Sequence, residues 1–191
     1  MRSRLGGNHS GVTRAFLLVD VIKDFHHEDG ERLLASYRAR HAALQRTLEE
    51  ARASATLVVY ANDNAGTWDS DAPGLVRRAV EEGKAGELVA AIAPRADDPV
   101  VLKPRYSAFD ATPLETVLRE RGVDELVVAG TATEMCVFQT VTDALRLGFR
   151  AAVQADACAT VDEENERLAL LYLERVLRVP MLSGALPRRS D

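Results

Sequence analysis

Residues 125–143 read ELVVAGTATEMCVFQTVTD and place a single cysteine where a predicted strand passes into a helix. The apolar run 126–129 ends at Gly130, a turn of small residues follows, and helical spacing of apolar residues begins at Cys136. A thiol in the first turn of a helix lies among unpaired backbone N–H groups at the positive end of the helix dipole. This position favours the thiolate, lowers its pKa and can hold an oxyanion. The stretch therefore predicts a cysteine nucleophile at a strand end.

Strand-like and helix-like segments alternate on both sides of this stretch. Residues 15–19 (AFLLV) form a continuous apolar run, which is typical of a strand buried on both faces. Strands are predicted at 15–19, 57–61, 100–102, 126–129, 151–154 and 179–182, and helices at 31–54, 75–91 with a break near 83–86, 113–121, from 136 onward, and 163–177. This alternation predicts an α/β fold with a parallel sheet covered by helices on both faces.

Composition narrows the class of protein. The 191 residues suit one domain, and we expect a flexible N-terminal tail over 1–13 followed by a single domain over 14–191. The net charge of −5 argues against nucleic-acid binding. No apolar stretch approaches the roughly 20 residues that cross a bilayer, so no membrane association is predicted. With only two cysteines and no recognisable signal peptide, a cytoplasmic location is expected.

Reactive side chains follow several of the predicted strands. Asp20 follows the first strand, NDN (62–64) the second, Lys103 the third, and Cys136 the turn after the fourth. Ligands of open parallel sheets bind outside the carboxyl ends of the strands, so these residues converge on the binding edge. Each one alone has a structural explanation as a helix cap, a solvated lysine or a small buried thiol. Their shared position favours a catalytic site.

Four sequence blocks resemble those of the isochorismatase-like cysteine hydrolases, a family that includes nicotinamidases and N-carbamoylsarcosine amidase. The blocks are LLVDVIKDF (17–25), YANDNAGTW (60–68), LKPRYSAFDAT (102–112) and VVAGTATEMCVFQTVTDA (127–144), and the resemblance covers residues 15–182. It implies a three-layer α/β/α sandwich with a six-stranded, Rossmann-like parallel sheet. It also implies a catalytic triad of Asp20, Lys103 and Cys136 and a cis peptide bond between Thr131 and Ala132.

The chemistry of these residue types assigns a role to each. Asp20 accepts the thiol proton of Cys136 and can return it to a leaving group. Lys103 supplies positive charge that favours both the carboxylate and the thiolate. The backbone N–H groups of Ala132 and Cys136 would form the oxyanion hole.

A cysteine–histidine pair is the competing mechanism. The four histidines, His9, His26, His27 and His41, all lie in the first quarter of the chain. His41 falls within a predicted helix and is expected to be exposed. His26 and His27 follow the first strand and either contact substrate or belong to a solvated loop, so the base is not assigned to them.

A metal site is not predicted. Metal-binding nicotinamidases resemble this chain but carry Asp-x-His after the second strand, whereas this chain has Asn62-Asp63-Asn64 there and no histidine after His41. We therefore expect neither a metal nor another cofactor.

Candidate substrate contacts lie at the motif ends, although the aromatic ones could equally belong to the core. They are Phe25, Asn62, Trp68, Tyr106, Phe109 and Phe138. The combination of Cys136 with Asp20 and Lys103 favours a hydrolase that acts on a small molecule. We expect it to cleave the C–N bond of an amide, ureido or carbamoyl group through a thioester intermediate. The alternatives are an isochorismatase-type vinyl-ether hydrolase and a redox-sensing thiol protein without enzymatic activity. A homo-oligomer, dimer or tetramer, is expected, and a neighbouring subunit could complete the pocket.

Overall fold

A single sheet of six parallel strands forms the centre of the protein, in the order β3-β2-β1-β4-β5-β6. The computed structural model describes residues 13–64, 66 and 70–186. The strands are β1 (Arg14–Val19), β2 (Leu57–Asp63), β3 (Val100–Lys103), β4 (Glu125–Thr131), β5 (Arg150–Ala159) and β6 (Met181–Leu182). All but one residue of the tail predicted over 1–13 lies outside the described residues.

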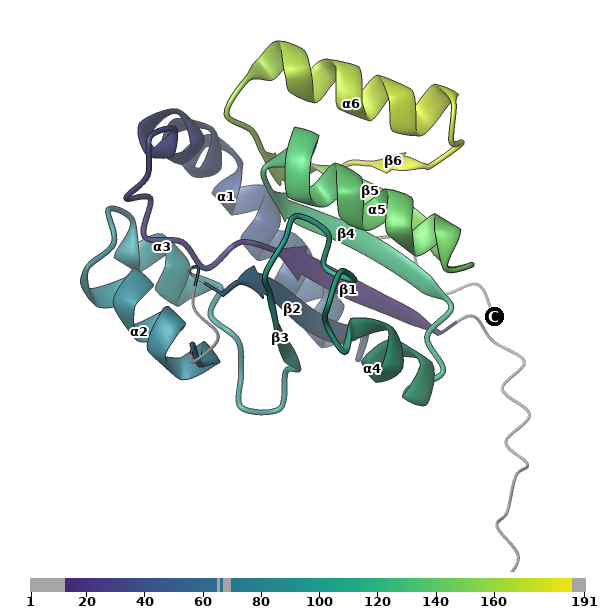
Figure 1. The fold of residues 1–191 in the computed structure, drawn as a ribbon, viewed down its shortest axis with the longest axis horizontal. Coiled ribbons are helices and arrows are strands. Elements are labelled where there is room, and N and C mark those ends of the chain that lie inside the picture. Colours follow the sequence, from purple (N-terminus) through teal and green to yellow (C-terminus); the bar gives the residue numbers. More distant parts are fainter. Residues whose placement is uncertain (1–12, 65, 67–69, 187–191) are drawn as a thin grey trace, which may run out of the picture.

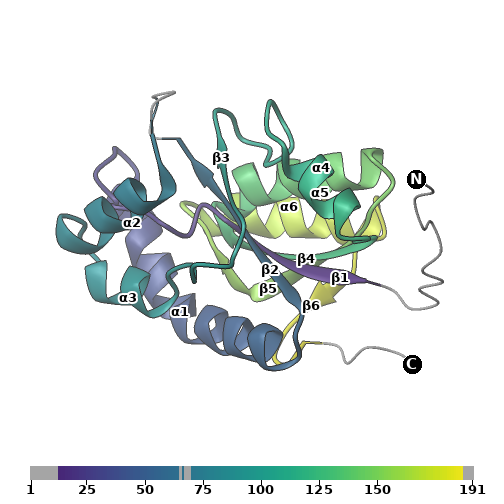
Figure 2. The ribbon, with the colours of Figure 1, turned by 90° about the horizontal axis from the view of Figure 1, so that it is seen from below.

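Helices cover both faces of the sheet. They are α1 (Gly30–Ala53), α2 (Ala72–Glu81), α3 (Gly86–Ala91), α4 (Leu114–Glu120), α5 (Phe138–Arg146) and α6 (Glu163–Arg175), with a π-helical turn, η1 (Thr133–Val137), before α5. Figure 1 shows the connectivity, and Figure 2 shows α1 and α3 on one face of the sheet and α4, α5 and α6 on the other. The predicted α/β/α sandwich is therefore confirmed. Within the described residues, no helix is both long and apolar enough to cross a membrane.

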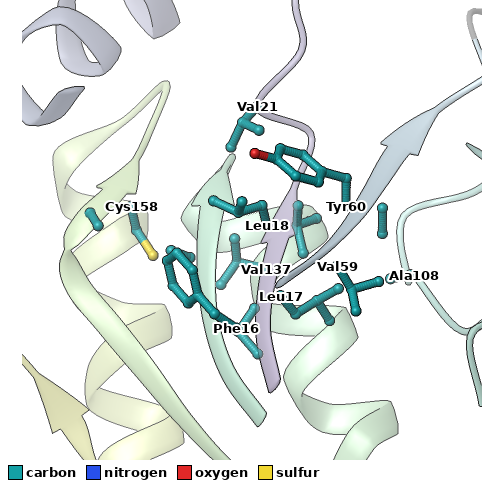
Figure 3. Packing of buried hydrophobic residues seen from close by; sticks show 14 of the residues in the cluster. Phe16, Leu17, Leu18, Val21, Val59, Tyr60, Ala108, Val137 and Cys158 are labelled. Atoms are coloured by element: carbon teal, nitrogen blue, oxygen red, sulfur yellow. The ribbon is translucent and has the colours of Figure 1, made fainter. Parts of the chain in front are cut away.

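Strand β1 is buried on both faces because it lies near the middle of the sheet. Its residues Phe16, Leu17 and Leu18 have no exposed surface, although their side chains alternate between the two faces. Figure 3 shows Leu17 beside Val59 and Leu18 beside Tyr60 of β2, with the Phe16 ring toward Cys158. This double burial explains why the strand sequence is uniformly apolar.

The strand order reverses between β1 and β4, so their carboxyl ends lie side by side with the chain leaving in opposite directions. Such a switch point opens a crevice for ligands. Val19 of β1 pairs with Gly130 of β4 there. Gly130 has a φ of 139°, and a Cβ at this position would lie 1.9 Å from the Val19 carbonyl oxygen. Only glycine permits this close approach next to the candidate site.

Strand β5 is longer than the predicted segment 151–154. It continues to Ala159 after an irregularity, since Val128 of β4 pairs with Val153 and Gly130 pairs with Cys158. The intervening sequence contains the polar residues Gln154 and Asp156, which interrupt the apolar pattern by which the strand was predicted. The Gln154 side-chain amide donates to Asp156 Oδ1 at 2.7 Å, so these polar groups are used within the fold.

The expected exposure of His41 is wrong. Its exposed fraction is 5%, and its Nε2 lies 2.8 Å from the Leu88 carbonyl oxygen of α3. The imidazole also packs near the Tyr37 ring, with the ring centroids 5.5 Å apart. Because its ring nitrogen has a backbone hydrogen-bond partner, His41 can be buried where α1 packs against α3.

The second cysteine, Cys158, yields a prediction about alkaline stability. Burial raises the pKa of Cys158 to about 12, whereas an unfolded thiol titrates near about 8.5. The stabilisation is complete below the unfolded pKa and is lost as pH rises toward the folded one. From about pH 8.5 to 10.5, the free energy of unfolding should fall more steeply in the wild type than in Cys158→Ala, by up to about 1.4 kcal/mol per pH unit. Denaturant titrations at several pH values measure this, and equal slopes would contradict it.

Candidate active site

Three strand ends deliver Asp20, Lys103 and Cys136 to one point. Asp20 directly follows β1, Lys103 is the last residue of β3, and Cys136 lies in η1 after β4. The Lys103 Nζ lies 2.7 Å from Asp20 Oδ2 and 3.5 Å from Cys136 Sγ. The structure thus brings the three residues of the predicted triad into contact distance.

Lys103 is buried with an exposed fraction of 1%, yet all its donors have acceptors. Besides Asp20 and Cys136, its Nζ donates to the Arg105 carbonyl oxygen at 3.0 Å. Burial alone would lower the pKa of Lys103, but the Asp20 carboxylate and the Cys136 sulfur outweigh it and raise that pKa. The ammonium is therefore permanently charged, and it stabilises negative charge on either neighbour.

Asp20 is fixed by the strands that flank β1. Its φ of 52° places it in the left-handed region, which turns the chain sharply at the strand end. Its Oδ1 accepts the Asp63 N–H at 2.7 Å, and its carbonyl oxygen accepts the Thr131 hydroxyl at 2.8 Å. Contacts from β2 and β4 therefore orient a carboxylate whose other oxygen faces Lys103.

The pKa of Cys136 is raised to about 12, contrary to the low value expected from a helix start. Burial is the main cause, followed by the Asp20 carboxylate, and the opposing charge of Lys103 is smaller in effect. Cys136 also lies in a short π-helical turn rather than in the first turn of a long helix. The resting thiol is thus protonated, with the Asp20 carboxyl group beside it.

The peptide bond between Thr131 and Ala132 is cis, and η1 begins one residue later. The Ala132 carbonyl accepts the N–H groups of Met135 and Val137 at 3.1 and 3.2 Å, which closes the turn around Cys136. Ala132 and Cys136 both line the pocket. Both residues of the predicted oxyanion hole therefore lie at the wall of the same pocket, and the hole itself stays a prediction.

A pocket of about 990 Å³ opens over these residues. Among the predicted substrate contacts, Tyr106 and Asn62 line it, and Tyr106 is half exposed. The Asn62 amide is already occupied, since its Oδ1 accepts the Ile22 N–H at 3.0 Å and its Nδ2 donates to the Ile22 carbonyl at 3.1 Å. Asn62 therefore holds the segment after Asp20 instead of offering its amide to a ligand.

Three predicted aromatic contacts lie away from the pocket, and we correct their assignment. Phe25 is fully buried against Tyr37, with ring centroids 5.1 Å apart. Phe109 stacks on Phe149 with their ring centroids 5.8 Å apart, and the Phe138 ring packs near the Tyr172 ring with centroids 6.0 Å apart. These three rings therefore pack against other aromatic side chains instead of lining the pocket. The remaining candidate, Trp68, lies outside the described residues.

Several pocket residues were not singled out by the sequence. They include Lys23, Arg78, Met135 and Gln139, and the pocket also contains both His26 and His27. Gln139 follows Cys136 by three residues, which is close to one helical turn, and this spacing could have predicted that both side chains face the pocket. Arg78 carried no signal because α2 approaches the pocket only through tertiary packing.

A metal site of the histidine-rich kind does not fit the described side chains. Among them, no three His, Cys, Asp or Glu residues gather closely enough to hold an ion. His26 Nε2, one of the imidazole nitrogens at the pocket, lies 3.0 Å from the Glu82 carbonyl oxygen. The donor set expected of such a metal centre is therefore not assembled among the described residues.

Comparisons with known proteins give a consistent result. A family profile of the isochorismatase domain matches residues 14–183. The uncharacterized isochorismatase family protein YaaI of Bacillus subtilis is 30% identical over 168 residues, which cover 88% of this chain and 92% of that protein. N-carbamoylsarcosine amidase from Thermoplasma acidophilum matches with a TM-score of 0.70 and 29% identity, over 90% of this chain and 96% of its own. The pyrazinamidase/nicotinamidase from Streptococcus mutans matches with a TM-score of 0.68 and 25% identity, over 88% of this chain and 99% of its own.

The Asp20–Lys103 ion pair yields a prediction about stability. Asp20→Asn leaves a buried ammonium without its counter-charge, which typically costs about 3–5 kcal/mol. We expect a loss of this size in the free energy of unfolding, and partial recovery in Asp20→Asn/Lys103→Met. The control is Glu115→Gln, which breaks the solvent-exposed Glu115–Arg119 pair and should change little. Denaturant titration decides the matter, and equal effects of Asp20→Asn and Glu115→Gln would refute it.

Proposed function

Because the chain belongs to the isochorismatase family of hydrolases, we propose that it is a metal-independent cysteine hydrolase that cleaves a C–N bond of a small molecule. The observation that carries this proposal is the contact of one buried ammonium, Lys103, with both Asp20 and Cys136. An acid–base group, a charge and a nucleophile in mutual contact are the parts that acyl transfer through sulfur requires. A redox-sensing thiol would need neither Asp20 nor Lys103.

Acylation begins from the protonated thiol. As Cys136 Sγ attacks the carbonyl carbon of an amide, ureido or carbamoyl group, the thiol proton passes to Asp20. The carbonyl oxygen becomes an oxyanion, which the N–H groups of Ala132 and Cys136 stabilise. The C–N bond then breaks, and Asp20 returns the proton to the departing nitrogen, which leaves ammonia or an amine and a thioester on Cys136.

Deacylation uses the same groups in reverse. Water attacks the thioester carbonyl while Asp20 accepts one of its protons. Collapse of the second tetrahedral intermediate breaks the C–S bond, releases the acid product and returns the proton to sulfur. Lys103 stays charged throughout and offsets whichever of Asp20 and Cys136 carries the negative charge. Asp20 and Cys136 therefore regain their starting protonation states after one turnover: the thiol proton leaves with the departing nitrogen, and a proton from water replaces it on sulfur.

The similar structures support the class of substrate. One is named an N-carbamoylsarcosine amidase and another a pyrazinamidase/nicotinamidase. Tyr106 and Gln139 at the pocket wall offer an aromatic face and an amide for orienting a small polar molecule. A panel of linear amides, ureides and N-carbamoyl compounds, with ammonia release as the readout, is the direct test.

The nucleophile yields a sharp prediction. Cys136→Ala should lower kcat by at least about a thousandfold, because the remaining groups have no atom to form the thioester. The melting temperature should stay near that of the wild type, because Cys136 is only partly buried. Cys158→Ala is the matched control, since its sulfur lies in the core and it should retain most activity. Wild-type turnover by Cys136→Ala would contradict the amidohydrolase and favour vinyl-ether hydrolysis.

Metal independence is tested by chelation. A catalytic zinc or iron site needs about three protein ligands, usually with histidine, and the described residues do not assemble them. Turnover should therefore survive exhaustive treatment with EDTA, whereas iodoacetamide should eliminate it. Loss of turnover on chelation, followed by recovery with zinc, iron or manganese, would show that a metal does participate.

A further inference from the structure

A buried carboxylate outside the pocket touches the turn that carries the nucleophile. Glu166 of α6 has an exposed fraction of 6% and is not among the residues that line the pocket. Its Oε1 lies 2.8 Å from the hydroxyl oxygen of Thr133, the first residue of η1. A charge is buried at a cost unless it is paired, so its retention here calls for an explanation.

Arg40 of α1 holds this carboxylate with two parallel hydrogen bonds. Its Nη1 lies 2.8 Å from Glu166 Oε1, and its Nη2 lies 2.7 Å from Oε2. The same Nη1 donates to the Cys158 carbonyl oxygen at 2.8 Å, which ties the pair to β5. Bonding to Glu166 raises the pKa of Arg40, so the guanidinium remains charged. The two-point geometry fixes the carboxylate in direction as well as position.

The next residue of the turn is anchored to the same region. Glu134 Oε2 accepts the Thr160 hydroxyl at 2.8 Å, and its Oε1 accepts the Val161 N–H at 3.1 Å. Thr133 also lies within 3.1 Å of the Ala159 carbonyl oxygen, so its hydroxyl proton can serve either acceptor. Two consecutive side chains thus fasten the start of η1 to the end of β5 and the start of α6, three residues before the thiol.

We infer that Glu166, held by Arg40, is a positioning residue for Cys136. The pair and Thr133 form a clamp, defined here as Arg40, Glu166 and Thr133, that fixes the backbone of η1. This backbone sets both the distance of Sγ from Lys103 and the direction of the Cys136 N–H. Because Asp20 and Lys103 lie on other elements, a shift of η1 alone would break the alignment of the three groups. The inference rests on the proposed function and adds a determinant to it.

Substitutions in the clamp should lower kcat rather than raise KM. A misplacement of reacting groups by about 1 Å can cost about a hundredfold in rate. We therefore expect Thr133→Val and Glu166→Ala each to lower kcat about tenfold to a hundredfold, with a much smaller change in KM. Thr133→Ser restores the hydroxyl and should recover most of kcat. In the double variant Thr133→Val/Glu166→Ala the two losses should not multiply, because both remove the same contact.

The matched control is Glu164→Gln on the same helix. Glu164 pairs with Arg167 at 2.7 Å, and both side chains are exposed, so kcat should stay close to that of the wild type. If Glu166→Ala fails to fold because Arg40 loses its counter-charge, Thr133→Val, which nearly keeps the side-chain shape, carries the test alone. Folded Thr133→Val with wild-type kcat, or multiplicative losses in the double variant, would overturn the inference.

A second readout needs no substrate. The rate at which iodoacetamide alkylates Cys136 at pH 8, in a Cys158→Ala background, depends on how the thiol is placed against Asp20 and Lys103. Thr133→Val should change this rate severalfold, and Glu164→Gln should not. If the wild type hydrolyses no amide but the alkylation rates separate in this way, the positioning stands while the proposed reaction falls. Equal alkylation rates in all variants would refute the positioning.

Discussion

The structure depends on a buried ion pair between Lys103 and Asp20, beside the point where the strand order reverses between β1 and β4. A buried ammonium is tolerated only with a nearby counter-charge and filled hydrogen bonds, and Lys103 has both. The pair joins the ends of β1 and β3 across β2. It also sets the electrostatics of Cys136, whose sulfur lies 3.5 Å from the same ammonium. The contact between Lys103 and Asp20 therefore matters both for the stability of the fold and for the charge next to Cys136.

The sheet makes this arrangement possible by fixing the strand ends. Strands β1 and β2 have fully buried central residues, so neither can slide without exposing apolar side chains. Gly130 lets β4 approach β1 at the height of Val19, and the turn to η1 follows directly. As a result, three residues far apart in sequence meet with little freedom to move. Preorganisation of this kind spares the site from reorganising during the reaction.

Two opposing effects decide the state of the thiol, and burial is the stronger. Lys103 favours the thiolate, but desolvation and the Asp20 carboxylate favour the protonated form. The proton therefore lies on sulfur at rest and has an acceptor beside it. A protonated thiol suits a hydrolase better than a redox sensor, because a sensor needs a standing thiolate.

The sequence by itself determined the α/β class, the approximate strands and the three residues Asp20, Lys103 and Cys136, because strand ends and their polar residues follow from local patterns. Tertiary structure alone decided which aromatic rings reach the pocket, which acceptor occupies the Asn62 amide, and the raised pKa of Cys136. It also brought Glu166 to the turn of the nucleophile. These properties depend on burial and on partners distant in the chain, and neither is encoded in the spacing of neighbouring residues.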